Sequence, residues 1–158
     1  MAQNESPLRP PMPFMGTYEP KIDDKGRFFL PAKFRTRFVD GLVISPGQER
    51  CLYVVPMADF MTAYAQLGEA PVTNKDVRDY QRMSMSASVD EVPDKQGRVS
   101  ITPRLREYAG LGTERECVVV GAGPRLEIWG SASWSTYSGA QEHIFAGISQ
   151  EVLVPRPQ

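Results

Sequence analysis

Short apolar runs separated by glycine, proline and aspartate predict that much of this chain forms β-strands. Segments of this kind, rich in β-branched and aromatic residues, favour strands joined by tight turns. Four such segments occupy the first half of the chain, at 17–22, 27–30, 42–44 and 51–55. Four more follow in the second half, at 87–92, 98–101, 117–120 and 126–129. Because both sets come in the same order, the pattern predicts two similar halves.

Helical spacing of apolar residues predicts short helices between these strands. Residues three or four apart lie on one face of a helix, and several apolar pairs have this spacing. They are Phe34 and Phe38, Phe60 and Tyr64, Val77 and Tyr80, Leu105 and Tyr108, and Trp134 and Tyr137. Pro31, Pro56 and Pro103 suit the first turns of three of these helices, and Asn74 and Thr102 suit helix caps. The overall pattern is that of an α+β, β-rich protein.

Two smaller patterns also carry an expectation. Met57 and Met61 lie four residues apart, which is typical of core residues on a helix. Three serines alternate with apolar residues at 84–88, which is the period of a strand. We therefore expect both methionines in the core and extended, strand-like backbone at these serines.

One five-residue motif occurs twice and organises both halves of the chain. Asp23-Asp24-Lys25-Gly26-Arg27 returns as Asp94-Lys95-Gln96-Gly97-Arg98, at a constant offset of 71 residues. Each copy leads into a strand, a proline and a short predicted helix. Two copies with the same flanking pattern indicate an internal duplication.

The motif has the composition of a tight turn that directs an arginine. An aspartate at its first position can accept a hydrogen bond from a backbone N–H two residues on, and glycine supplies the positive φ that ends the turn. Arg27 and Arg98 then follow on the outgoing strand, close to the hairpin tip. An ordinary turn with a solvated arginine is the simpler interpretation of one copy, and the equivalent second copy argues against it.

The start of the first half has a distinctive combination of short segments: Phe14-Met15-Gly16-Thr17-Tyr18, then Ile22 to Arg27, then Leu30-Pro31. This combination resembles the opening of the MraZ family, bacterial transcriptional regulators of the AbrB-like, swapped-hairpin class. The family carries two Asp-x-x-x-Arg motifs, one per repeat. The resemblance implies an AbrB-like swapped-hairpin barrel with flanking short helices, built from two tandem pseudo-repeats at 14–83 and 84–148.

The resemblance also implies a function and a setting. Members of this family assemble into closed rings and bind direct repeats of DNA ahead of their own operon, a division and cell-wall gene cluster, which they repress. For this chain the resemblance implies a ring-shaped homo-oligomer on double-stranded promoter DNA. It implies no membrane, no small-molecule substrate and no cofactor, and a cytoplasmic, nucleoid-associated protein.

Charge along the chain makes the first motif the stronger candidate for a contact with DNA. The net charge is only −1, so no global basic field attracts a polyanion. Residues 21–37 nevertheless carry a local charge of +4, whereas the matching window 91–107 carries +1. Local charge therefore decides where a nucleic acid would bind.

A hairpin tip carrying basic side chains fits the major groove of DNA. Arginine can bond guanine through two parallel donors, while lysines mostly neutralise phosphates. The predicted DNA-binding residues are Lys25, Arg27, Lys33, Arg35, Arg37 and Arg98. The residues predicted to shape the turns are Asp23, Gly26, Asp94 and Gly97. We expect Asp23 either to hold its turn or to orient Arg27 by a charge-assisted hydrogen bond.

Other chemistries find little support in the sequence, and we expect neither an enzyme nor a metal site. Gly121-Ala122-Gly123 lacks the third glycine and the following helix of a dinucleotide loop. His143 is the sole histidine, without an acidic or cysteine partner at ligand spacing. Cys51 and Cys117 are isolated and are expected to be reduced and mostly buried.

Both ends of the chain are expected to be loose, and one residue departs from the family pattern. Residues 1–13 are polar and proline-rich, as in a disordered extension, and 149–158 are predicted to be a flexible tail. The first 15 residues lack the apolar core of a signal peptide. Phe29 is bulky where the family has a small polar residue, which affects how closely this edge approaches DNA. The alternative function is a ring-forming scaffold, in which the Asp–Arg pairs are salt bridges between subunits.

Overall fold

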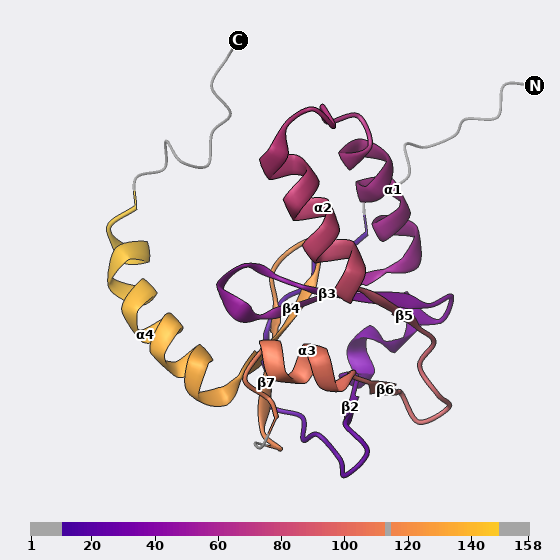
Figure 1. Ribbon diagram of the computed structural model, residues 1–158. Helices are drawn as coiled ribbons and strands as arrows, with labels where there is room; N and C mark the ends of the chain where they lie inside the picture. Colours follow the sequence, from indigo (N-terminus) through magenta and orange to yellow (C-terminus); the bar gives the residue numbers. More distant parts are fainter. Residues whose placement is uncertain (1–10, 113–114, 149–158) are drawn as a thin grey trace, which may run out of the picture.

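The computed structural model describes residues 11–112 and 115–148 (Figure 1). Its strands are β1 Thr17–Tyr18, β2 Arg27–Phe29, β3 Leu42–Pro46, β4 Leu52–Pro56, β5 Val89–Glu91, β6 Arg98–Ser100, β7 Cys117–Gly121 and β8 Leu126–Gly130. Its helices are η1 Ala32–Phe38, η2 Gln48–Arg50, α1 Met57–Leu67, α2 Lys75–Ala87, α3 Pro103–Tyr108 and α4 Ser131–Ala146, of which the two η elements are 3₁₀ helices. The predicted α+β, β-rich class is confirmed.

The strands form one antiparallel sheet and a separate two-stranded ribbon. The sheet has six strands in the order β1-β7-β8-β4-β3-β5. The ribbon, called the β-ribbon below, consists of β2 and β6, one from each half of the chain. Both β-ribbon strands lie toward the lower end of the molecule in Figure 1. The two halves are therefore interleaved, because strands from one half pair with strands from the other in both sheets.

The duplication in the sequence becomes an approximate twofold symmetry in space. Phe28 pairs with Val99, its own counterpart at the offset of 71 residues. In the large sheet, β4 pairs with β8, and Tyr53 lies opposite Glu127. An antiparallel pair of equivalent residues lies on an axis that exchanges the two strands. The two halves thus share their central contacts, as the swapped-hairpin class predicts.

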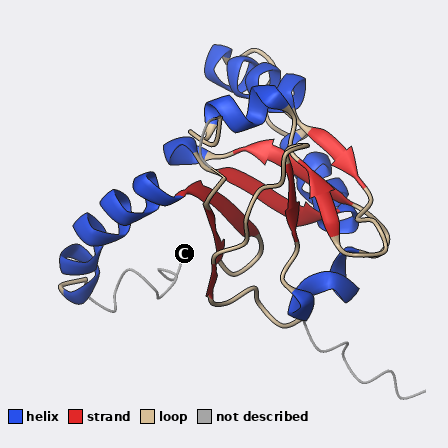
Figure 2. Ribbon diagram, turned by 90° about the horizontal axis from the view of Figure 1, so that it is seen from below, coloured by secondary structure: helices blue, strands red, loops and turns tan. Residues whose placement is uncertain are grey.

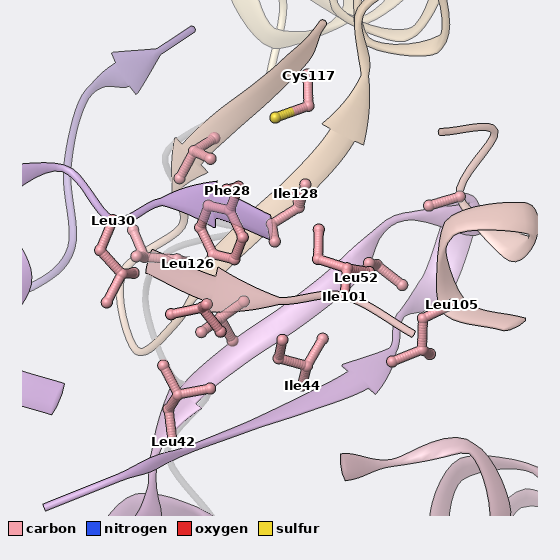
Figure 3. Packing of buried hydrophobic residues seen from close by; sticks show 14 of the residues in the cluster. Phe28, Leu30, Leu42, Ile44, Leu52, Ile101, Leu105, Cys117, Leu126 and Ile128 are labelled. Carbon is pink, nitrogen blue, oxygen red and sulfur yellow. The ribbon is translucent and has the colours of Figure 1, made fainter. Parts of the chain in front are cut away.

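One hydrophobic core joins the β-ribbon to the large sheet. Phe28 is completely buried and Val99 is 2% exposed. Figure 3 shows Phe28 close to Leu126 and Ile128 of β8. Burial of an aromatic side chain of this size contributes about 2 kcal/mol. The inward side chains of the β-ribbon therefore hold it against the sheet and leave its other face outward.

A second apolar cluster lies where α4 leaves the sheet. Trp129 of β8 contacts Trp134 and Tyr137 of α4, with ring centroids 5.3 and 4.8 Å apart. The buried Glu127 carboxylate beside it accepts hydrogen bonds from Arg125 and from the Trp129 indole N–H. Both tryptophans are therefore packing residues.

Several predicted elements differ in extent from the observed ones. The first strand stops at Tyr18 because Pro20 has no N–H for the ladder, and pairing resumes only as isolated bridges at Lys21 and Ile22. The helix after Pro31 is a 3₁₀ helix that buries Phe34 and Phe38. Asn74 and Thr102 cap α2 and α3 through their side chains, as predicted.

Two expectations for the middle of the chain are wrong. The serines at 84 and 86 lie within α2, which continues to Ala87, so the extended backbone begins only at Ser88. Met61 is 54% exposed, because α1 turns this side chain away from the sheet.

Candidate nucleic-acid interface

The first Asp-x-x-x-Arg turn is held by the carboxylate of its own aspartate. Asp23 Oδ1 accepts hydrogen bonds from the backbone N–H groups of Lys25 and Arg27, each at 2.9 Å. Its Oδ2 accepts from Arg27 Nε at 2.8 Å. Gly26 adopts a positive φ of 75° and donates its N–H to the Asp23 carbonyl. Asp23 thus performs both roles that the sequence left open, since it holds the turn and orients Arg27.

The second turn repeats this geometry bond for bond. Asp94 Oδ1 accepts from the N–H groups of Gln96 and Arg98 at 2.9 Å, and Oδ2 accepts from Arg98 Nε at 2.6 Å. Gly97 has a φ of 77°. Both Asp–Arg pairs are therefore formed within one turn, rather than between distant segments.

These donors stabilise the ionised form of both carboxyls. The backbone N–H of Arg27, followed by its guanidinium and the N–H of Lys25, holds the pKa of Asp23 below its ordinary value, against a smaller effect of burial. The N–H and side chain of Arg98 and the N–H of Gln96 lower the pKa of Asp94 in the same way. Both turns are consequently set up to persist at neutral pH.

The β-ribbon brings the two arginines onto one exposed face. Because side chains alternate along a strand and Phe28 and Val99 point inward, their neighbours point outward. The outward residues, called the ribbon face below, are Arg27, Phe29, Arg98 and Ser100. Register places Arg27 opposite Ser100 and Phe29 opposite Arg98, so the arginines occupy diagonal corners.

Each of these arginines retains donors for a ligand. The side chains of Arg27 and Arg98 are 24% and 28% exposed. Their Nε atoms bind the aspartates, and within residues 11–112 and 115–148 the structure shows no hydrogen bond from their terminal amino groups. Phe29 follows Arg27 on the outward side of β2, lies opposite Arg98 and is 41% exposed. The ribbon face therefore offers two partly exposed guanidinium groups, held from behind, with an aromatic side chain adjacent to both.

Arg35 and Arg106 lie against the turn glycines of the opposite repeat. A Cβ atom added to Gly97 would lie 2.8 Å from Arg35 Cζ, and one added to Gly26 would lie 2.7 Å from Arg106 Cζ. A backbone hydrogen bond joins the same two segments, since the Leu30 N–H donates to the Gly97 carbonyl at 2.8 Å. Each guanidinium thus packs on the turn that the other half contributes, a contact called the arginine clamp below.

The remaining predicted cations differ in their surroundings. Lys25 and Lys33 are exposed, the first at the tip of its turn and the second on η1. Arg37 donates to the Met12 carbonyl at 2.6 Å, and its guanidinium lies 3.7 Å from the centre of the Phe14 ring. Arg37 therefore attaches the segment before β1 rather than joining the ribbon face.

Sequence reasoning missed two contributors to this region. Arg106 was not a predicted site residue, although its position at the same offset of 71 from Arg35 could have indicated it. Lys95 is exposed in the second turn, as Lys25 is in the first. Residues 1–10 and 149–158, predicted to be loose, lie outside the described residues.

The thiols and acidic groups of the described segments offer no alternative chemistry. Burial raises the pKa of both Cys51 and Cys117 to about 12, and each thiol donates to a backbone carbonyl. Both are free and buried, as predicted. Residues 11–112 and 115–148 contain no cluster of three His, Cys, Asp or Glu side chains suited to a metal ion. Among the same residues, no helix has the length and apolarity needed to cross a bilayer.

The interleaved halves and paired turns define an AbrB-like protein of two tandem repeats. The family model described as "MraZ protein, putative antitoxin-like" matches residues 13–83 and 87–153. The chain therefore belongs to the MraZ family.

Curated relatives give the same assignment. The chain is 51% identical to the "Transcriptional regulator MraZ" of Kineococcus radiotolerans and 56% identical to that of Parafrankia sp.. It is 51% identical to the relative of the same name from Thermobifida fusca. Each alignment covers 89% of this chain and 96% of the relative. This is a family of transcriptional regulators and not of enzymes, in agreement with the sequence prediction.

Proposed function

We propose that this chain is a transcriptional regulator that binds double-stranded DNA through its ribbon face. The observation that carries the proposal is the pairing of β2 with β6, which sets Arg27 and Arg98 on one exposed face. Its relatives bear the name of transcriptional regulators. A two-stranded ribbon has dimensions that the major groove of B-DNA admits.

The chemistry of the ribbon face suits base edges. The terminal amino groups of an arginine can donate two hydrogen bonds to guanine, while an aromatic side chain can contact the methyl group of thymine. Asp23 and Asp94 hold the Nε atoms and so limit the rotation of each guanidinium. A restrained arginine loses less conformational freedom on binding, which favours recognition of bases over loose attraction to phosphate.

The exposed lysines would supply contacts to the DNA backbone. Lys25 and Lys95 lie in the two turns, and Lys33 lies on η1. Phosphate contacts position a protein on DNA, while base contacts carry the sequence information. We assign Arg35 to positioning the second turn and Arg37 to holding the segment before β1, and neither to direct base contact.

We further propose that several copies act together as a ring. A net charge of −1 gives a single copy little electrostatic affinity for DNA. Several weak contacts on evenly spaced DNA repeats become tight through effective concentration. The proposed target is a set of promoter repeats ahead of the chain's own division and cell-wall operon, which the cytoplasmic, nucleoid-associated protein would repress.

The test is a gel shift with the DNA directly upstream of the gene, beside scrambled DNA of equal length. We expect Arg27→Ala to weaken binding to the upstream DNA by roughly 5- to 150-fold, because a bidentate contact to guanine is worth about 1–3 kcal/mol. Its oligomeric state should stay unchanged. Arg82→Ala is the matched control, since Arg82 is an exposed cation of α2 outside the ribbon face.

Two outcomes would count against the proposal. Equal affinity of the wild-type chain for upstream and scrambled DNA would remove sequence recognition. An Arg27→Ala variant that binds normally but dissociates into single chains would favour the scaffold alternative, in which the motif serves assembly.

A further inference from the structure

The C-terminal end of α4 is an exposed apolar surface. Ile144, Phe145 and Ile148 are 57%, 76% and 48% exposed. Ile144 and Phe145 belong to the last turn of α4, which ends at Ala146, and the Ile148 N–H just beyond it donates to the Phe145 carbonyl. In both Figures 1 and 2, α4 extends away from the rest of the molecule. Three neighbouring apolar side chains at a projecting end are typical of an interaction site. We call this surface the α4 tip.

The same chain carries an apolar cavity in a different place. The cavity has a volume of about 390 Å³ and lies between the β3–β4 loop, α2 and α3. Its apolar lining includes Met83 and Ala87 from α2 and Leu105 from α3. Met83 is 64% exposed, so part of this lining is open to solvent. The volume is ample for a phenylalanine side chain and one or two aliphatic neighbours.

Charge at the cavity complements the end of a helix. Arg50 and Arg104 both line the cavity, and the backbone of Arg50 has a positive φ of 60°. The last carbonyl groups of a helix lack partners within the helix and carry partial negative charge. The α4 tip also follows the exposed carboxylate of Glu142. The exposed carboxylate of Glu107 also lines the cavity, so its rim carries two cations and one anion. A rim of net positive charge around an apolar hollow therefore suits the α4 tip.

A second apolar hollow in the described part of the chain lacks this complementarity. It lies between α1, α2 and the sheet, and it is lined by Phe60, Tyr64 and Leu67. Its lining includes the carboxylate of Asp59 and no lysine or arginine. An approaching helix C-terminus would meet only a like charge there, whereas two arginines outnumber Glu107 in the cavity beside α3, so net charge favours that cavity.

We propose that the α4 tip of one copy inserts into the cavity beside α3 of a second copy. Insertion within one chain is excluded by direction, because α4 leads away from α2 and α3 in both views (Figures 1 and 2). Tip and cavity are different surfaces, so each copy offers one of each. Such a head-to-tail contact repeats from copy to copy and closes into a ring when the rotation permits. The inference rests on the proposed ring and names the contact that would build it.

Two complementary variants test this contact without DNA. Phe145→Glu places a charge on the α4 tip, and Met83→Glu places one in the cavity lining. Both residues are exposed in the single chain, so neither change disturbs its core. Each variant alone should elute as a single chain in sizing with light scattering. Met61→Glu, at an exposed apolar position of α1, is the control and should keep the wild-type oligomer.

Mixing the two variants gives the decisive result. The intact tip of the Met83→Glu chain should enter the intact cavity of the Phe145→Glu chain, while the other two surfaces are blocked. An equimolar mixture should therefore form dimers and nothing larger. Variants that each keep the wild-type oligomer, or a mixture that stays monomeric, would overturn the proposed contact. The second result would leave the cavity to another occupant, such as a small ligand.

The assay separates this inference from the proposed function. Suppose that the single variants are monomeric and their mixture forms dimers, but the wild-type oligomer does not bind upstream DNA. This result would support the contact and refute DNA binding. If the wild type binds upstream DNA and the variants keep the wild-type oligomer, DNA binding would be supported and the contact refuted.

Discussion

At the scale of single residues, the two aspartates account for the shape of the site. Asp23 and Asp94 each accept three hydrogen bonds, two from the backbone and one from an arginine. One carboxylate thereby closes a turn and aims the side chain that follows it. The carboxylate binds the arginine through Nε and leaves its terminal amino groups available. Turn stability and ligand contact therefore use different atoms of the arginine.

Acid should loosen both turns. Because the pKa of each aspartate is lowered in the folded chain, the stabilisation is complete above the ordinary value of about 3.9 and is lost as pH falls through the lowered value. NMR titration should show the amide signals of Lys25 and Arg27 moving together in this acidic range. Near neutral pH the turns should not change.

Asp23→Asn provides the control for this titration. It should abolish the acid transition at the first turn and leave that of Gln96 and Arg98 in place. Amide signals that instead moved with a midpoint above 3.9 would contradict the lowered pKa values.

At the scale of elements, the β-ribbon couples the two repeats. All residues of β2 and β6 pair across the two halves, and the arginine clamp links each short helix to the opposite turn. The orientation of the second turn thus depends on Arg35 of the first repeat. This arrangement explains how two turns that are far apart in the sequence can hold a fixed relation on DNA.

Removal of one clamp should affect the distant turn more than the near one. Arg35→Ala should raise amide hydrogen exchange at 94–98 several-fold, with a smaller change at 23–27, because Arg35 packs on Gly97. DNA affinity should fall without a change in the slope of log affinity against log salt, since a positioning residue releases no counterion.

Lys33→Ala, two residues earlier on η1, is the matched comparison. Loss of a phosphate contact there should reduce the magnitude of the salt slope by about 1 for each subunit engaged on the DNA and leave exchange at 94–98 unaltered. An Arg35→Ala variant that behaves like Lys33→Ala would assign Arg35 to the DNA backbone instead.

At the scale of the whole molecule, weak sites acquire affinity by repetition. Each chain presents one ribbon face, and its low net charge limits what a single face can do. The α4 tip and the cavity beside α3 supply the means to repeat it. Assembly and DNA binding would then use separate surfaces of one subunit, which allows each to be altered alone.

Binding should depend steeply on salt and on the number of DNA repeats. Each phosphate contact releases a counterion, so the negative slope of log affinity against log salt should grow with the number of subunits engaged. DNA with two properly spaced elements should bind at least tenfold more tightly than DNA with one. Fluorescence anisotropy over a salt series measures both quantities.

Spacing provides the control for this experiment. Insertion of half a helical turn of DNA between two elements should return the affinity to that of one element. An affinity indifferent to salt, or equal for one and two elements, would rule out the multivalent mechanism.

The sequence by itself determined the features that depend on neighbouring residues. The duplicated motif predicted two Asp-Gly turns, Asn74 and Thr102 predicted helix caps, and apolar spacing predicted that Phe34 and Phe38 share one face of a short helix. Each of these is set by hydrogen bonds or sterics within a few residues, so the chain encodes it locally. The identification of the family rested on the same local motifs.

Only the tertiary structure decided which distant residues meet. The pairing of Phe28 with Val99 follows from their burial in a core that both halves share, and that pairing turns Phe29 outward. The placement of Arg35 on Gly97 follows in turn. The boundary between α2 and β5 was also decided by the tertiary structure. The serines at 84 and 86 alternate with apolar residues as in a strand, but they lie in α2, and β5 begins only at Val89. Such contacts depend on how separate elements fill a common core, which no short stretch of sequence specifies.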